Sequence, residues 1–391
     1  MPGIYIHIPF CKQACHYCNF HFSTSLGQKE KMVAAIVREI NLSQPQHLLS
    51  HPLFDELEMM AAQKKSEVIS TLYFGGGTPS LLNDNDLKLI FEALHERFVF
   101  ADKIEITLEA NPDDITVLKL NAWKALGINR LSVGIQSFLE EELKWMNRVH
   151  TAAESLICIE KIRDAGFTNF SVDLIYGSPI LSDDDWKKNA ALVIEKDIPH
   201  ISCYSLTVEP KTALYKMITL NKKEPVDAEK QARQFLLLMD WMEQAGYEHY
   251  EISNFAKTGL RSKHNSSYWF GKPYYAFGPG AHSFDGKTRR WNIANNALYI
   301  QALQQGIIPF EEEILTEIQQ LNEYIMISLR TIEGLDLDYV SKRFGAEKSK
   351  RITVASNNYR STGKLKEVNQ RFILTREGKL FADGIAADLF F

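Results

Sequence analysis

Three closely spaced cysteines near the N-terminus are the residues with the clearest chemistry. Cys11, Cys15 and Cys18 directly follow a short apolar stretch that begins at Ile4. Thiolates are soft ligands that select zinc or iron–sulfur clusters, and a four-iron cluster ordinarily takes four cysteines. A set of three leaves one iron with an open position for a substrate, by the same logic that leaves a catalytic zinc open. We therefore expect an iron–sulfur site that binds a second molecule.

Spacing alone leaves two other uses of these cysteines open. Cys15 and Cys18 form a CxxC pair, which is typical of redox motifs, although a redox pair has no need of Cys11. His16 or His21 could instead complete a four-ligand zinc site with the three cysteines.

The composition is that of a soluble globular protein from a reducing compartment. The 391 residues are 45% hydrophobic and 24% charged, and the net charge of −5 argues against nucleic acid as the main partner. No stretch approaches the ~20 apolar residues of a membrane span, and the N-terminal stretch lacks the basic region and cleavage site of a signal peptide. Five cysteines do not form a disulfide framework, and Cys158 and Cys203 lie in apolar patterns that predict core positions. We expect a cytoplasmic location.

Strand-like and helix-like patterns alternate through the first two thirds of the chain. Runs rich in Ile, Val, Leu, Phe and Tyr predict strands at 4–9, 69–74, 104–109, 130–135, 170–176 and 200–206. Between them lie helical patterns with N-caps at Asn83 and Ser182 and a C-cap at Gly246. Residues 44–67 are predicted to be a helix-rich connection. Repeated βα units indicate a parallel sheet, either a barrel or a doubly wound sheet.

The alternation ends beyond Ile252. Residues 255–290 are dense in aromatic residues, Gly and Pro, and the pattern becomes helical from Glu311, with a short strand near 371–374. We predict an α/β domain at 1–255, a connecting region at 256–310, and a small α-rich, winged-helix-like domain at 311–391.

Polar residues collect where successive predicted strands end. "GGGTPS" at 75–80 follows the second strand, Glu109 ends the third, Gln136 follows the fourth, and Asp173 lies in the fifth. Parallel α/β folds bind ligands at the carboxyl ends of their strands, and glycines let a ligand approach the backbone. We expect a ligand site at this rim, with a structural polar layer as the alternative.

The motifs resemble the radical S-adenosylmethionine (SAM) superfamily. A strand followed by CxxxCxxC, and then "GGGTP" after the second strand, carry this resemblance. "IYIHIPFC", "YFGGGTPS", "RLSVGIQSF", "MNR", "VDLIYGSP" and "FILTREGKLFADGIAADL" are similar to the oxygen-independent coproporphyrinogen III oxidase family over nearly the whole chain. The resemblance implies a partial (β/α)6 barrel. It also implies a [4Fe-4S] cluster whose fourth iron binds SAM, which an electron from the cluster cleaves to a 5′-deoxyadenosyl radical.

The resemblance assigns residues to both cofactors. It implies that Cys11, Cys15 and Cys18 bind the cluster. SAM contacts would come from Tyr5, Tyr17, Gly76, Gly77, Thr78, Glu109, Gln136, Arg148 and Asp173. An arginine can fork onto the SAM carboxylate, and acidic side chains suit ribose hydroxyls and the positive sulfonium.

Two departures separate this sequence from the true oxidases. Those enzymes carry CxxxCxxCxC, whereas Phe20 stands at the position of the additional cysteine, and they carry a segment before the cluster strand, which here begins at Ile4. Both features match a sister branch, the HemW-type haem chaperones.

A second motif supports this branch. "HNSSYW" at 264–269 matches its HNxxYW signature, which implies a haem site at His264, Asn265, Tyr268 and Trp269. His282 in "GPGAHSF" is a second candidate ligand, and a packed aromatic seam between domains is the alternative reading of this region.

We therefore expect a haem chaperone that carries a [4Fe-4S] cluster, SAM and haem, and that delivers haem to acceptor haemoproteins. Respiratory, membrane-associated acceptors and a homodimer are candidate partners, and no coproporphyrinogen oxidase activity is expected. The first alternative is an oxygen-independent coproporphyrinogen III dehydrogenase that decarboxylates two propionates. An RNA-modifying SAM enzyme lacks the expected basic character, and a zinc-stabilised binding module leaves the strand-end residues unexplained.

Overall fold

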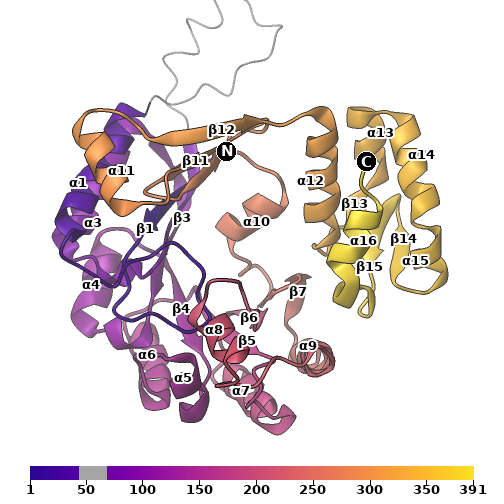
Figure 1. The fold of residues 1–391 in the computed structure, drawn as a ribbon, viewed down its shortest axis with the longest axis horizontal. Coiled ribbons are helices and arrows are strands. Elements are labelled where there is room, and N and C mark those ends of the chain that lie inside the picture. Colours follow the sequence, from indigo (N-terminus) through magenta and orange to yellow (C-terminus); the bar gives the residue numbers. More distant parts are fainter. Residues whose placement is uncertain (44–67) are drawn as a thin grey trace, which may run out of the picture. The chain divides into compact units, whose positions relative to one another are not determined.

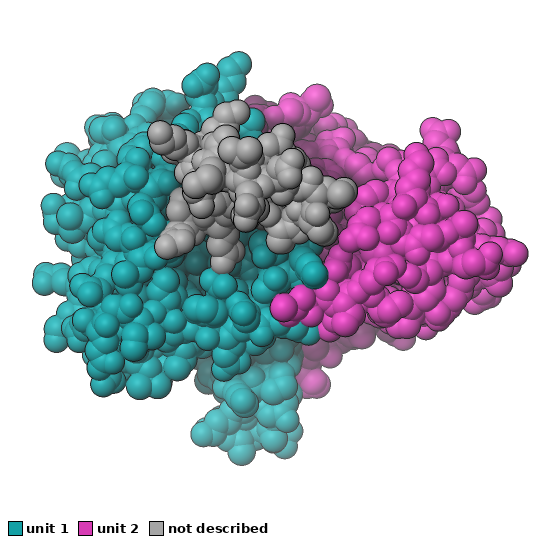
Figure 2. All heavy atoms as spheres, turned by 90° about the horizontal axis from the view of Figure 1, so that it is seen from above, with its two compact units in different colours: residues 1–173, 207–224, 272–313 teal, residues 174–206, 225–271, 314–391 magenta. Residues whose placement is uncertain are grey.

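The structure, a computed structural model, describes residues 1–43 and 68–391, which divide into two compact units (Figure 2). The first unit comprises Met1–Asp173, Thr207–Glu224 and Lys272–Glu313, and the second comprises Leu174–Leu206, Pro225–Gly271 and Ile314–Phe391. The predicted helix-rich connection at 44–67 lies outside the described residues. The predicted division at 255 and 310 stays a prediction.

A mixed sheet forms the centre of the first unit. Its strands are β1 (Gly3–Ile8), β2 (Val68–Gly76), β3 (Val99–Ala110), β4 (Arg130–Gln136), the first half of β5 (Phe170–Tyr176), β9 (Tyr274–Phe277), β10 (His282–Phe284), β11 (Thr288–Asn292) and β12 (Phe310–Ile314). Their order is β12-β11-β10-β9-β1-β2-β3-β4-β5. Strands β1 to β4 pair in parallel, and β1 also pairs in parallel with β9. The predicted parallel α/β sheet is confirmed.

Helices connect and flank the strands of this sheet. They are α1 (Lys29–Leu42), α3 (Asp84–Arg97), α4 (Val117–Ala125), α5 (Glu140–Met146), α6 (Ala152–Asp164), α8 (Ala213–Thr219) and α11 (Asn296–Gln304), with short 3-10 turns η1 (Pro79–Leu81) and η2 (Pro112–Asp114). Figure 1 shows α1, α3, α4 and α6 in a row along the strands. The predicted cap at Asn83 is confirmed, because its side chain accepts from the Asp86 amide in a capping box.

The two faces of the central strands differ in polarity. On β1, Ile4, Ile6 and Ile8 are at most 1% exposed and form an apolar face. The alternate positions are polar, and the parallel register aligns Tyr5 with Tyr73, Tyr73 with Thr107 and Thr107 with Arg130 in one row. The strands are thus buried on both faces, but one of these faces is lined by polar side chains.

The second unit begins with the end of β5. It contains α7 (Asp183–Glu195), β6 (His200–Ser205), α9 (Ala228–Gln244), β7 (Glu248–Glu251), β8 (Asn254–Ala256) and α10 (Lys263–Trp269), with β8 antiparallel to both β6 and β7. The predicted cap at Ser182 is confirmed by its bond from the Asp185 amide. Helix α9 ends two residues before Gly246, whose φ of +78° is typical of the residue that follows a helix.

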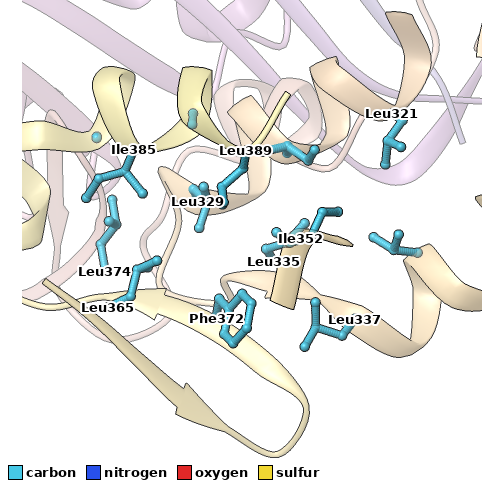
Figure 3. Packing of buried hydrophobic residues seen from close by; sticks show 14 of the residues in the cluster. Leu321, Leu329, Leu335, Leu337, Ile352, Leu365, Phe372, Leu374, Ile385 and Leu389 are labelled. Atoms are coloured by element: carbon cyan, nitrogen blue, oxygen red, sulfur yellow. The ribbon is translucent and has the colours of Figure 1, made fainter. Parts of the chain in front are cut away.

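The C-terminal part of the second unit is α-rich, as predicted. Its elements are α12 (Glu317–Leu329), β13 (Leu335–Asp336), α13 (Leu337–Phe344), α14 (Ala346–Ala355), α15 (Asn357–Ser361), β14 (Leu365–Val368), β15 (Arg371–Leu374), η3 (Gly378–Phe381) and α16 (Ala382–Asp388). A small antiparallel sheet, ordered β13-β15-β14, packs with these helices around an apolar cluster that includes Leu329, Leu335 and Phe372 (Figure 3). The helical pattern begins at Glu317 rather than Glu311, because β12 occupies the residues before it. No helix in the described part of the chain is long and apolar enough to cross a membrane.

Candidate functional site

The loop that carries the three cysteines is anchored by backbone hydrogen bonds within the first unit. The Cys11 amide donates to the Ser23 carbonyl at 3.0 Å, and the Ser23 amide donates to the Pro9 carbonyl at 2.9 Å. In the middle of the loop, the His16 carbonyl accepts from the Leu214 amide at 2.7 Å. All three cysteines are free thiols of intermediate exposure. The loop is therefore fixed at both ends and at its centre, with its thiols within reach of solvent.

Two side chains, Thr78 after β2 and Arg148 after α5, donate hydrogen bonds to these thiols. Thr78 Oγ1 lies 3.5 Å from Cys11 Sγ, and Arg148 Nη1 lies 3.3 Å from Cys15 Sγ. Burial raises the pKa of Cys11 to about 11, with the Thr78 hydrogen bond lowering it and the neighbouring thiols of Cys18 and Cys15 adding to the rise. Ligation needs the thiolate, so a metal centre would have to displace these protons.

The thiols do not converge on a single point. Within residues 1–43 and 68–391, no three His, Cys, Asp or Glu side chains are grouped so that they could hold one metal ion. A zinc site requires four donors about 2.0–2.3 Å from one centre, whereas the cysteines of a four-iron cluster bind different irons. His16 Nδ1 lies 3.0 Å from the Trp145 carbonyl, and His21 Nε2 lies 2.8 Å from Asn296 Oδ1. One ring nitrogen of each histidine is thus hydrogen-bonded within the protein, and cluster ligation stays a prediction.

The glycines at the end of β2 are required by contacts with β1 and the residues that follow it. The Gly77 amide donates to the Ile8 carbonyl at 2.8 Å, and a Cβ on Gly77 would lie 2.5 Å from the Phe10 carbonyl oxygen. Gly76 has a φ of +113°, and a Cβ there would lie 2.7 Å from the His7 ring. Close packing therefore accounts for these glycines. Their predicted role in letting SAM approach the backbone remains a prediction.

Glu109, at the end of β3, is held by a residue that sequence reasoning did not select. Tyr73 on β2 donates its hydroxyl to Glu109 Oε1 at 2.8 Å. Burial raises the pKa of Glu109 to about 7, the Tyr73 hydrogen bond lowers it, and the nearby Asp173 raises it. Tyr5, in register with Tyr73, places its hydroxyl 3.2 Å from His7 Nδ1. Glu109 thus acts electrostatically on Tyr5, and Asp173 acts on Glu109, while the contact of these three residues with SAM stays a prediction.

Arg148 connects the end of β4 to the cysteine loop. Its Nη2 donates to the Gly134 carbonyl and to Asn111 Oδ1, both at 2.7 Å, while its Nη1 reaches Cys15. Arg148 Nε is buried and has no hydrogen-bond partner among the described residues. Asn111 Nδ2 in turn lies 3.4 Å from Thr78 Oγ1. Asn111 was missed by the sequence analysis, although its position directly after β3 is the signal used for the other strand ends.

Tyr17 and Gln136 lie close to this group. Burial raises the pKa of Tyr17, and Arg148 and the thiols of Cys15 and Cys18 also act on it. Gln136 ends β4 with a positive φ of +68°. All nine predicted SAM contacts lie in the first unit together with the three cysteines.

The HNxxYW motif forms the short helix α10 in the second unit. Ser262 caps it by accepting from the Asn265 amide. His264 is only 1% exposed, its Nε2 lies 2.8 Å from the Tyr268 hydroxyl, and the two rings meet edge to face at 5.0 Å. Trp269 is half-buried, with the Arg330 guanidinium 5.9 Å from its ring centre. The Nε2 atom of the first candidate haem ligand is thus already hydrogen-bonded.

His282, the second candidate ligand, has a different environment. It begins β10 in the first unit, is exposed, and pairs with Trp291 on β11, whose ring is stacked on it at 6.1 Å. His264 belongs to the second unit and His282 to the first, and each is a candidate ligand by itself.

Comparisons with known proteins agree with this arrangement. Residues 5–193 match the radical SAM superfamily, and residues 315–381 match the HemN C-terminal domain. The chain is 31% identical over 388 residues to the haem chaperone HemW of Bacillus subtilis, and this alignment covers 98% of each protein. It is 33% identical over 287 residues to the haem chaperone HemW of Escherichia coli K12, and this alignment covers 72% of the chain and 69% of the relative.

A solved structure extends the comparison to the fold. Coproporphyrinogen III oxidase HemN from Escherichia coli, a radical SAM enzyme, matches with a TM-score of 0.81 at 21% identity and covers 100% of this chain and 90% of its own. At this identity the likeness establishes the fold, a radical SAM α/β fold followed by a helical C-terminal region. Because the similarity to the relatives extends over nearly the whole of both chains, the chain belongs to the family of the haem chaperone HemW.

Proposed function

We propose that this protein binds haem and delivers it to acceptor haemoproteins. The observation that carries the proposal is the similarity to the haem chaperone HemW of Bacillus subtilis over 98% of both chains. Phe20 supports the same choice, because the resemblance places an additional cysteine of the true oxidases at this position. Its side chain is 68% exposed, so the packing of the loop does not demand a phenylalanine there.

Cys11, Cys15 and Cys18 would hold a [4Fe-4S] cluster. Three soft thiol groups of intermediate exposure on one anchored loop fit such a centre. When bound, the cluster supplies an electron and an open iron position for SAM. Thr78 and Arg148 would donate hydrogen bonds to the coordinating sulfur atoms, and the anchored loop would hold the three sulfurs in place.

SAM would be held at the strand ends of the first unit. The buried and unpartnered Arg148 Nε is the observation that fits an anionic group, and the SAM carboxylate is such a group. Glu109 would accept a hydrogen bond from a ribose hydroxyl, with Tyr73 fixing its orientation. Tyr5, Tyr17, Gly76, Gly77, Thr78, Gln136 and Asp173 would complete the contacts.

For haem, we propose His264 as the iron ligand, with Asn265, Tyr268 and Trp269 beside the porphyrin. The support is the HNxxYW motif on one short helix. Ligation through Nε2 requires that the hydrogen bond to Tyr268 opens first. His282 is the second candidate, favoured by its exposure and by the stacked ring of Trp291.

The location and the assembly belong to the same proposal. We place the protein in the cytoplasm, supported by five cysteines that are all free in the described structure. Respiratory, membrane-associated haemoproteins are proposed acceptors, and a homodimer is the proposed assembly.

Anaerobic purification tests the cofactors. The reconstituted protein should bind about four iron and four sulfide per chain. Cys18→Ser should lose most of both, while the matched control Cys158→Ser should retain them, because Cys158 is 1% exposed inside α6. Stoichiometric zinc without sulfide would overturn the cluster assignment.

Haem binding and transfer test the function itself. His264→Ala should change the visible spectrum of the haem complex and slow transfer to an apo-haemoprotein, with unchanged iron–sulfur content. If His282→Ala has these effects instead, the ligand is reassigned and the carrier function stands. Decarboxylation of coproporphyrinogen III by a protein that transfers no haem would overturn the proposal in favour of the oxidase.

A further inference from the structure

Strand β4 ends in a strained turn at Gln136. The Ser137 amide donates to the Ile135 carbonyl at 2.9 Å, which closes a three-residue γ-turn centred on Gln136. Gln136 has a φ of +68°. A γ-turn with positive φ is rare and strained, and a non-glycine residue in such a conformation persists only where its surroundings enforce it. The question is which groups enforce it.

A buried histidine holds the carbonyl on which this turn closes. His150 is 3% exposed, and its Nε2 lies 3.0 Å from the Ile135 oxygen that also accepts from Ser137. Since a carbonyl only accepts, Nε2 carries the hydrogen. Burial and the neighbouring Arg148 together lower the pKa of His150 to about 4, against the raising effect of the hydrogen bond to Ile135. The ring is therefore neutral near pH 7, with its proton on Nε2 and its buried Nδ1 unpartnered among the described residues.

The residues on either side of the turn are held as well. Ser137 Oγ donates to Glu142 Oε2 at 2.8 Å and accepts from the Leu139 amide at 3.1 Å, and both Ser137 and Glu142 are buried. On the other side, Arg148 donates to the Gly134 carbonyl. The consecutive carbonyls of Gly134 and Ile135 are thus held by Arg148 and His150, which are two residues apart in the chain.

We propose that His150 is a positioning residue for SAM, which acts by holding the Ile135 carbonyl and thereby keeping Gln136 in its strained conformation. The proposal rests on the proposed contact between Gln136 and SAM. Arg148 is connected to the site directly, through its hydrogen bonds to Cys15 and Asn111. Among the residues that the structure describes, His150, in contrast, has no hydrogen bond to any of the predicted SAM contacts and bonds only the Ile135 carbonyl. The Ile135 carbonyl is the link between His150 and the ligand.

A double-mutant cycle on the reconstituted holoprotein tests this. The SAM dissociation constant is measured by anaerobic equilibrium dialysis for wild type, Gln136→Ala, His150→Leu and the double variant, with iron and sulfide determined in each sample. His150→Leu should weaken SAM binding by roughly 5- to 10-fold, as expected for one lost buried hydrogen bond. In the Gln136→Ala background the same change should have no further effect.

Two further variants separate positioning from general structural support. His150→Gln keeps an N–H donor near the Nε2 position and should restore most of the affinity. His150→Asn, whose donor is too short to reach the carbonyl, should behave like His150→Leu while remaining polar. His200→Leu is the matched control, since it removes a buried histidine hydrogen-bonded to Tyr250 in the second unit, and SAM affinity should not change.

The outcomes distinguish the proposal from the function on which it rests. Equal losses from His150→Leu in the wild-type and Gln136→Ala backgrounds, or equal losses from His150→Gln and His150→Leu, would overturn the positioning role and leave the SAM site intact. Wild-type affinity in Gln136→Ala would instead refute the contact between Gln136 and SAM, and the positioning role with it.

Discussion

Replacing Tyr73 by phenylalanine removes one hydroxyl from the centre of the proposed SAM site. That hydroxyl donates to Glu109 Oε1 at 2.8 Å, and Tyr73 is 7% exposed, so water cannot readily take its place. The ring itself can stay, because phenylalanine keeps the apolar outline next to Tyr5, whose ring is stacked on Tyr73 at 6.1 Å. The substitution therefore isolates the hydrogen bond to the carboxyl group.

The expected magnitude follows from the state of Glu109. Its pKa is raised to about 7 by burial and by Asp173, against the opposing effects of the Tyr73 hydroxyl and the Gly76 amide. A hydrogen bond to a charged group contributes ~1.5 kcal/mol, so its loss raises the pKa of Glu109 to about 8. If SAM binds the ionised carboxylate, the ionised fraction at pH 7 falls from about one half to roughly one tenth. SAM affinity should then fall by about 5-fold at pH 7 and by almost nothing at pH 9.

The assay is the SAM dissociation constant of reconstituted wild type and Tyr73→Phe between pH 6 and 9. In both proteins the affinity should rise with pH, because the ionised fraction of Glu109 rises, with the midpoint of the variant about one pH unit higher. Titration of the amino group of SAM itself affects both proteins alike and cancels in the comparison. Coincident midpoints would refute the reasoning, as would an equal loss of affinity at every pH.

Three other expectations follow from the contacts. Arg148→Ala should weaken SAM binding by roughly 10- to 150-fold, the range for charge-assisted hydrogen bonds, and equal affinity by equilibrium dialysis would mean that the site is misplaced. Burial raises the pKa of Glu39 in α1 to about 7 from 4.5, so its contribution to folding stability is present below pH 4.5 and is lost as the pH rises through 7. The free energy of unfolding of Glu39→Gln, measured in urea, should not decline over this pH range. Parallel pH profiles of stability for wild type and Glu39→Gln would contradict this expectation. Tyr268→Phe removes the hydrogen bond at His264 Nε2 and should strengthen haem binding by about 5-fold in a visible titration, whereas an unchanged affinity would point to His282.

The strands and the cysteine loop were predictable because their signals are local. Apolar runs of six or seven residues bounded by glycine or polar residues placed β5 and β4 to within one residue, and the cysteine spacing lies within one loop. Strand β3 begins five residues earlier than predicted, because the exposed polar residues Asp102 and Lys103 interrupt the apolar pattern between Val99 and Ile104.

The groups that support the site were not predictable in this way. The bond from Tyr73 to Glu109 depends on the register between β2 and β3, and the contact of His150 with Ile135 depends on how the chain returns after α5. Neither pairing leaves a periodic pattern. The need for glycine at position 77 could not be predicted either, because only the folded structure shows that the Phe10 carbonyl occupies the place of a Cβ.

The position of β1 has a consequence for the order of events during synthesis. This strand is translated before the other described strands of its sheet, yet it lies between β2 and β9 and needs both neighbours for its backbone hydrogen bonds. The residues that pair with it on β9 are translated about 270 positions later. Until β9 is translated, one edge of β1 has no hydrogen-bond partner, and the cysteine loop that follows β1 is attached to an incomplete sheet. The nascent chain therefore exposes its cysteines long before they can be held in place, so cluster insertion belongs after translation has passed β9 rather than at the start of folding.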